Sequence, residues 1–151
     1  MRRQRATGQA MVEFALVLPM FAILLFGIVD LGRYVYTANA LGNGTREGAR
    51  AASVSVRPSP ICDGLSRFAC AEAVVHSQSW GVPGSIIDPE VSCWRGNGTD
   101  VNLVQINASS ECTTNDFLRV HAETDFTLVT PLIAQFLGSQ TITAETQVTV
   151  N

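Results

Sequence analysis

Residues 11–29 read MVEFALVLPMFAILLFGIV, and this stretch decides how the rest of the chain is organised. Its only charged residue is Glu13. A helix of this length spans about 28 Å, close to the hydrocarbon core of a bilayer, which is about 30 Å thick. A buried helix that is apolar on all faces needs a larger surrounding protein than 151 residues provide. The stretch therefore predicts a helix that crosses a membrane.

Three arginines precede this span and predict its orientation. Arg2, Arg3 and Arg5 should stay on the cytoplasmic side, because positive charges next to a span are retained there. Everything after Asp30 is then extracytoplasmic. We expect a single-pass protein of the cell (inner) membrane with its N-terminus in the cytoplasm.

A cleaved secretory signal is the competing interpretation of the same N-terminus. The Arg-rich start, the apolar run and the small-residue triplet Ala38-Asn39-Ala40 fit its requirements. The apolar run, however, is longer than the roughly 7–15 residues of such signals. A charged and aromatic stretch, residues 30–36, also separates the run from the supposed cleavage site. These two features favour the membrane span.

The helical pattern continues beyond the span. Apolar residues recur at helical spacing, at Leu31, Val35, Ala38 and Leu41. Small residues then recur every four positions, at Ala40, Gly44, Gly48 and Ala52. Such a ridge permits another backbone to approach closely. The alternative is that Gly42, Asn43 and Gly44 break the helix, since an interior Gly costs about 1 kcal/mol relative to Ala.

The charge distribution excludes one class of partner. The chain has a net charge of -3, but residues 56–151 carry four Arg against ten Asp and Glu, and no Lys. An acidic region without clustered cations repels a phosphate backbone. We therefore expect no binding to nucleic acid.

The C-terminal part alternates apolar and polar residues in two segments, which indicates two half-buried strands. The first lies at 118–128, with apolar residues at Leu118, Val120, Ala122, Phe126 and Leu128. The second lies at 141–150, where Ile142, Ala144, Val148 and Val150 share one face. Between them Thr130 can cap a short helix, Pro131 suits its first turn and Gly138 suits its end.

Further elements complete the predicted fold. Two strands, at about 90–95 and 101–106, should flank a turn at 96–99. A second helix is expected from residue 65 to about residue 78, with Asp63 as its cap. The fold class is α+β: a long N-terminal transmembrane and amphipathic helix, then a small disulfide-containing domain with an antiparallel sheet.

All four cysteines follow the span, on the side expected to be oxidising. They are Cys62, Cys70, Cys93 and Cys112, and two disulfides are expected among three possible pairings. Proximity favours Cys62 with Cys70 and Cys93 with Cys112, although a regular helix through both 62 and 70 would hold their Cα atoms too far apart. A zinc site is the rival, but no CxxC or HxxxH spacing occurs.

The sequence offers little enzyme chemistry. His76 and His121 are the only imidazoles, and His121 lies on the polar face of a predicted strand. Ser77 and Ser79 near His76 fit a helix end better than a nucleophile. The chain has no nucleophile elbow, phosphate-binding loop or dinucleotide fingerprint. We expect neither a catalytic residue nor a cofactor.

Residues at the N-terminus carry a resemblance to a known family. The run Thr7-Gly8-Gln9-Ala10-Met11-Val12-Glu13-Phe14 precedes an apolar helix that contains Pro19, and Asp30-Leu31-Gly32-Arg33 follows it. Together with Arg46-Glu47-Gly48-Ala49-Arg50, these segments resemble the TadE-like family of tight-adherence (Tad, or Flp) pilus assembly proteins. Residues 120–150 are similar to the family's tail, and residues 56–115 match nothing.

The resemblance implies a processing site. In this family, as in type IV pilins, a membrane-embedded prepilin peptidase cuts after a Gly, and Glu is the fifth residue of the new N-terminus. On this chain it implies a leader ending at Gly8, with Gln9 as the first mature residue and Glu13 as the fifth. Filament-forming pilins usually begin with an apolar residue, and Gln9 is polar. This difference favours a minor pilin or pseudopilin.

Glu13 has two interpretations. A carboxylate carried to the centre of a bilayer costs up to about 2.5–3.5 kcal/mol, so it needs a partner or the interface. The freed amino group of a neighbouring subunit's Gln9 is one such partner, and this pair would set the axial register between subunits. Alternatively, Glu13 snorkels or stays protonated at the headgroups.

The expected organisation has three regions: a leader at 1–8, the transmembrane helix and its extension at 9–55, and an extracytoplasmic α+β domain at 56–151. The expected partners are the lipid bilayer, prepilin peptidase, and other Tad pilus subunits and assembly proteins. An uncleaved, membrane-anchored module that binds a partner outside the cell is the alternative function.

Overall fold

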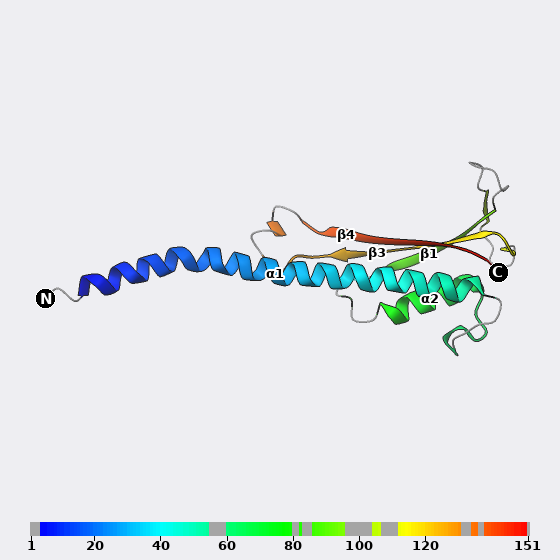
Figure 1. Ribbon diagram of the computed structural model, residues 1–151, viewed down its shortest axis with the longest axis horizontal. Coiled ribbons are helices and arrows are strands. Elements are labelled where there is room, and N and C mark those ends of the chain that lie inside the picture. The colour runs from blue at the N-terminus through cyan, green and yellow to red at the C-terminus, as the bar shows by residue number, and fades with distance from the viewer. Residues whose placement is uncertain are drawn as a thin grey trace.

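The computed structural model contains one very long helix and a small domain folded against its second half (Figure 1). The structure describes residues 4–54, 60–79, 82, 86–95, 104–106, 112–130, 134–135 and 138–150. Helix α1 (Gln4–Ser53) is continuous, although Pro19 lies inside it. At 1.5 Å per residue its 50 residues extend about 75 Å. The predicted continuation of the span into an outer helix is therefore confirmed.

The N-terminal half of α1 projects away from the domain, and no other part of the described chain covers it (Figure 1). Its large apolar side chains are exposed, among them Phe14, Leu16 and Met20. Within the described residues this is the one helix long and apolar enough to cross a membrane. Apolar side chains that face outward on every side suit a lipid environment.

The domain is an antiparallel sheet with helices on one face. The strands are β1 (Ile86–Arg95), β2 (Val104–Ile106), β3 (Phe117–Phe126) and β4 (Gln140–Thr149), in the order β2-β1-β3-β4. The second half of α1 lies against β3 and β4, and helix α2 (Arg67–Gln78) lies against α1 and β1. The fold class expected from the sequence is thus confirmed.

The alternating patterns predicted for the C-terminal part appear as alternating burial. On β3 every second residue is buried, including Leu118, Val120 and Phe126. On β4 Ile142 is buried, and Val150 just beyond the strand is buried as well. These side chains form one core with the outer half of α1 and with α2 through Leu41, Ala49, Ala52, Ala71 and Val75.

Several predicted boundaries need correction. Helix α2 begins at Arg67 and is capped by Ser66, whose hydroxyl accepts a hydrogen bond from the Ala69 N–H at 3.2 Å, so the prediction of Asp63 as cap was wrong. Strand β1 begins at residue 86, earlier than expected, and its register with β3 shifts between Ile87 and Glu90. Strand β2 is described at 104–106, and the expected turn at 96–99 lies outside the described residues.

The short helix expected between β3 and β4 is described only in part. Ala134 and Gln135 are helical, and the Ala134 N–H donates to the Thr130 carbonyl at 2.9 Å. Gly138 follows with a φ of +64° and donates to the Ala134 carbonyl at 2.9 Å. A Gly in the left-handed region after a helical turn is the predicted end of this helix. Pro131 lies outside the described residues.

The small-residue ridge of α1 is the contact with α2. A Cβ on Gly48 would lie 2.7 Å from Val75 Cγ2 and 2.9 Å from the Ala71 carbonyl oxygen. A Cβ on Gly44 would lie 2.8 Å from Ser79 Oγ. At Gly48 no side chain fits against the α2 backbone, and at Gly44 one would have to displace the Ser79 hydroxyl, so the two helices approach closely along these glycines. The ridge is confirmed, and the alternative in which 42–44 break the helix is wrong.

Both expected disulfides form, and they follow the pairing that proximity favours. Cys62 pairs with Cys70, with 4.8 Å between their Cα atoms, and Cys93 pairs with Cys112 at 6.0 Å. The first bridge avoids the problem of a continuous helix because Cys62 ends a separate 3-10 turn, Pro60–Cys62. Gly64, with a φ of +77°, then reverses the chain before α2 begins.

Candidate functional site

The residues implied in processing lie on the free end of α1. Gly8, Gln9 and Glu13 are helical and exposed. A Cβ at Gly8 would meet nothing within 4 Å, so a larger side chain fits there without a clash. Gln9 and Glu13 are four residues apart and therefore share one face of the helix, one turn from each other.

A second candidate site, which the sequence did not reveal, lies where α1 meets the domain. Asp30, the first residue after the predicted span, is only 3% exposed. Its carboxylate accepts hydrogen bonds from the Val129 N–H at 2.9 Å, the Thr130 N–H at 3.0 Å and the Thr130 hydroxyl at 2.6 Å. A buried carboxylate with three donors ties the chain after β3 to the helix.

Two neighbours of Asp30 strengthen this junction. Arg33 Nη1 donates to the Thr127 carbonyl at 3.3 Å and to Asp30 Oδ1 at 3.4 Å, and its guanidinium lies 5.3 Å from the centre of the Phe126 ring. The ring of Tyr34 meets Phe126 edge to face, with 5.7 Å between centroids. The first turn of α1 beyond the span therefore fixes the near end of the sheet.

One signal in the sequence could have indicated this junction. Asp30 is a lone carboxylate directly after a span, in a helix whose neighbouring positions are apolar. A charge there needs partners. The partners themselves lie 99 and 100 residues away, and no local pattern identifies them.

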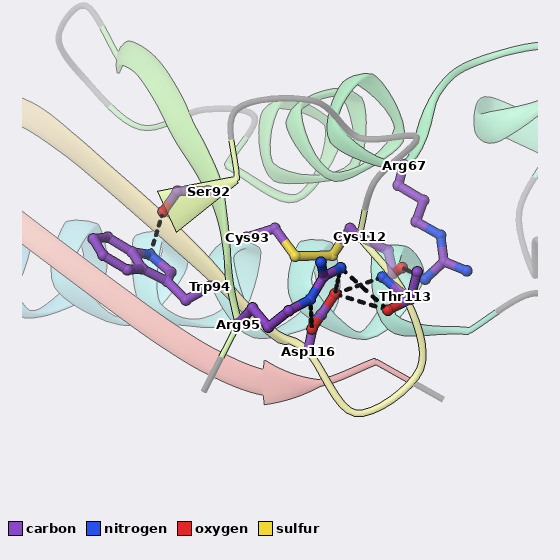
Figure 2. The surroundings of a disulfide bond; sticks show 9 residues. Arg67, Ser92, Cys93, Trp94, Arg95, Cys112, Thr113 and Asp116 are labelled. Carbon is purple, nitrogen blue, oxygen red and sulfur yellow. Dashed lines mark hydrogen bonds and ion pairs between the residues drawn. A yellow bond between two sulfur atoms is a disulfide. The ribbon is translucent and has the colours of Figure 1, made fainter. Parts of the chain in front are cut away.

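The far end of the domain carries an ion pair beside a disulfide, in which Asp116 is buried and Arg95 is half exposed (Figure 2). Arg95 donates from Nε and Nη2 to the two oxygens of Asp116, both at 3.0 Å. Thr113 adds its N–H at 2.7 Å and its hydroxyl at 3.0 Å. These donors, Arg95 first, lower the pKa of Asp116 to about 2 although burial opposes the shift.

This corner does not suit a metal. The sulfur atoms of Cys93 and Cys112 and a carboxylate oxygen of Asp116 lie within 4.8 Å of one another. Both sulfurs belong to the disulfide and offer no thiolate, which is the form that binds zinc. The Asp116 carboxylate is already occupied by Arg95 and Thr113. The group therefore has a structural role: it holds residues 112–116, which lead into β3, against the end of β1.

The two histidines lie apart. His121 is on the outer face of β3, as its position in the alternating pattern predicted, with Nε2 3.9 Å from Glu123 and Nδ1 3.8 Å from Glu145. His76 is exposed in the last turn of α2, which covers the opposite face of the sheet. The structure does not bring them into one site.

The fold and its two disulfides define a class of protein. It has one apolar helix able to cross a membrane, continued directly into a small disulfide-bonded α+β domain. Residues 8–50 match the family model described as TadE-like protein. The resemblance read from the sequence is thereby confirmed over this segment, and a TadE-like segment implies a part in Tad pilus assembly. The match starts at Gly8 and stops before α2, so it covers α1 and not the sheet. No curated protein and no solved structure matches the chain.

Proposed function

We propose that this chain is a pseudopilin-like minor subunit of the Tad pilus machinery, matured by a prepilin peptidase that cuts between Gly8 and Gln9. The match to the TadE-like family, which begins at Gly8, carries this proposal. The exposure of Gly8 and Gln9 supports it, because a peptidase needs access to the residues on both sides of the bond it cuts. The chain has a structural role and performs no catalysis of its own.

Glu13 acts after cleavage. The new amino group of Gln9 in one subunit pairs with the Glu13 carboxylate of its neighbour, and this pair sets the axial register between packed helices. The exposure of Glu13 supports the idea, since no group of the described chain occupies its carboxylate. In a low dielectric such a pair strengthens, while an unpaired carboxylate is costly.

The membrane orientation follows from charge and redox chemistry. The N-terminal arginines stay in the cytoplasm, and the domain that carries both disulfides lies outside, where disulfides persist. The partners of the protein are the bilayer, the peptidase, and the other pilus subunits and assembly proteins.

The test uses the intact mass of the full chain purified from membranes with and without its peptidase. With the peptidase, the wild-type mass should fall by residues 1–8. Gly8→Arg should remain at precursor length yet stay in the membrane, and pili should be lost. Gly42→Arg is the matched control, because Gly42 also sits on α1 with nothing within 4 Å of a Cβ. It should be processed like wild type.

Glu13→Ala separates cleavage from assembly. The Gly8–Gln9 bond is unchanged in this variant, so its mass should still fall, while pili should become fewer because the charge partner is gone. If Gly8→Arg matures normally and both variants support wild-type pili, the proposal is wrong. The uncleaved, membrane-anchored binding module would then be the better account.

A further inference from the structure

An apolar groove opens at the junction between α1 and the sheet. Its walls are Gly27, Leu31 and Tyr34 of α1 with Phe126 and Leu128 at the end of β3, and its volume is about 300 Å³. The polar groups among its lining residues are the Tyr34 hydroxyl, the amide of Gln140, which is exposed, and Asp30, whose carboxylate is already bonded to Val129 and Thr130. The groove therefore offers carbon surface to whatever fills it.

The groove starts at the depth where the predicted span ends. Gly27 is within the span of 11–29, and Tyr34 lies seven residues further along α1, about 10 Å along the axis. The α1 residues that line the groove thus extend from the edge of the hydrocarbon core into the headgroup layer. A tyrosine at this level is typical of a membrane interface.

Exposed apolar side chains around the groove continue the surface of the span. Val29 is 51% exposed, Leu31 62%, and Val129 at the base of the domain 54%. Val129 is held in this position by the bond from its N–H to Asp30. The domain thus presents apolar side chains toward the membrane, where their burial among acyl chains is favourable.

We infer that the groove holds one acyl chain of a membrane phospholipid, whose headgroup lies at the level of Tyr34. This inference rests on the membrane placement in the proposed function. The groove is continuous with the span, since Gly27 belongs to both, so an acyl chain of the bilayer reaches the groove without crossing water. The bound chain would hold the domain upright at the membrane surface.

Gly27 allows a direct test, because a Cβ at this position meets nothing within 4 Å. A phenylalanine there grows into the groove without disturbing the fold. Gly32 is the matched control, since it is equally open but lies about 140° further around the helix, away from the groove. The two variants add the same side chain to the same helix.

The experiment places the full chain in nanodiscs of phosphatidylglycerol that carry a diazirine near the carboxyl end of one acyl chain, within reach of the groove, and maps the photolabelled peptides by mass spectrometry. Wild type and Gly32→Phe should be labelled at 126–128, and Gly27→Phe should lose that label several-fold. Label within 11–29 should be equal in all three proteins and reports insertion separately.

Two results would overturn the inference. One is a span that is labelled while 126–128 is not, and the other is a Gly27→Phe variant labelled at 126–128 as strongly as wild type. In the first case the groove is closed to lipid, as a contact with a second copy of the chain would make it. A span without label would instead refute the membrane placement, and so the proposed function itself.

Discussion

The two halves of α1 are one continuous helix with opposite surfaces. In the first half, large side chains point outward, and Leu16 is 70% exposed. In the second half Leu41 is fully buried and Ala49 is 1% exposed. The first half carries bulky residues for a fluid surrounding, whereas the second carries small ones that admit α2 and the sheet. Side-chain size and polarity together separate the exposed half from the protein-facing half.

Asp30 marks the border between these halves. Before Asp30, no other described part of the chain covers the side chains of α1. After it, each turn of the helix meets the domain, at Asp30 itself, at Leu41 and Thr45, and at Gly48. Substitutions before Asp30 should therefore change insertion and assembly, and substitutions after it should change the stability of the domain.

The largest effect is expected where α1 touches α2. Gly48→Leu places a side chain where even a Cβ would lie 2.7 Å from Val75 and 2.9 Å from the Ala71 carbonyl. Because backbone is in the way, the helices must separate, and we expect a loss of about 3 kcal/mol or more. The measurement is denaturant unfolding of the full chain in detergent micelles.

Gly42→Leu is the control for this substitution. Gly42 lies on the same half of α1, and a Cβ there meets nothing within 4 Å. The variant should be as stable as wild type or slightly more so, since leucine favours helix over glycine. Equal destabilisation by both substitutions would mean that glycine serves the helix itself and not the contact with α2.

The next largest effect concerns the border. Asp30→Ala leaves the Val129 and Thr130 N–H groups and the Thr130 hydroxyl without their acceptor, and we expect a loss of about 2–3 kcal/mol. Amide hydrogen exchange at 129 and 130 should accelerate strongly, while exchange in β3 changes less. Asp30→Asn keeps one acceptor oxygen, so its stability should lie between that of wild type and that of Asp30→Ala. Unchanged protection in the alanine variant would show that the junction does not depend on this carboxylate.

The sequence predicted those features whose cause is local. Strands β3 and β4 were visible because one face of each is buried, which produces alternation along the chain. The α1–α2 contact was visible as a four-residue repeat of small residues, although the partner helix was not. Both disulfides were expected, but the turn at Gly64 that makes the first one possible could not be read from spacing alone.

Other features depend on distant contacts and were missed. Strand β1 begins before the predicted start at residue 90 and includes Pro89, which has no N–H to donate to a ladder. The strand accommodates it through a shift of register, in a part of β1 that β2 does not pair with. Asp63 and Ser66 are both good caps, and the choice of Ser66 follows from Gly64 turning the chain between them. The Asp30 junction joins residues about 100 positions apart.

A smaller effect than at the Asp30 border is expected at the far end of the domain. Asp116 has a pKa of about 2 when folded against 3.8 ordinarily, so its stabilising contribution is present above about pH 4 and is lost as the pH falls toward 2. The contribution is on the order of 1–2 kcal/mol. Unfolding curves of wild type and Asp116→Asn should therefore converge as the pH falls from 4 to 2. A constant difference over this range would show that the folded pKa is not lowered.

The smallest effect is expected at two buried threonine hydroxyls in the protein-facing half, and it shows whether such groups stabilise the fold when they are paired. The Thr45 hydroxyl is fully buried, donates to the Gly42 carbonyl at 3.1 Å and lies 3.1 Å from the Thr146 hydroxyl on β4. The Thr37 hydroxyl, two turns earlier, is also fully buried, and among the described residues no group hydrogen-bonds to it.

A Thr→Val substitution keeps the shape of the side chain at both positions. Thr45→Val should cost about 1 kcal/mol, because it leaves Thr146 without its partner, whereas Thr37→Val should be neutral or stabilising, because it removes an unpaired buried hydroxyl. Chemical denaturation of the two variants gives the comparison, and Thr146→Val combined with Thr45→Val should cost less than the sum of the single changes. If Thr37→Val proves the more destabilising of the two, a hydrogen bond of the Thr37 hydroxyl must outweigh the one between α1 and β4.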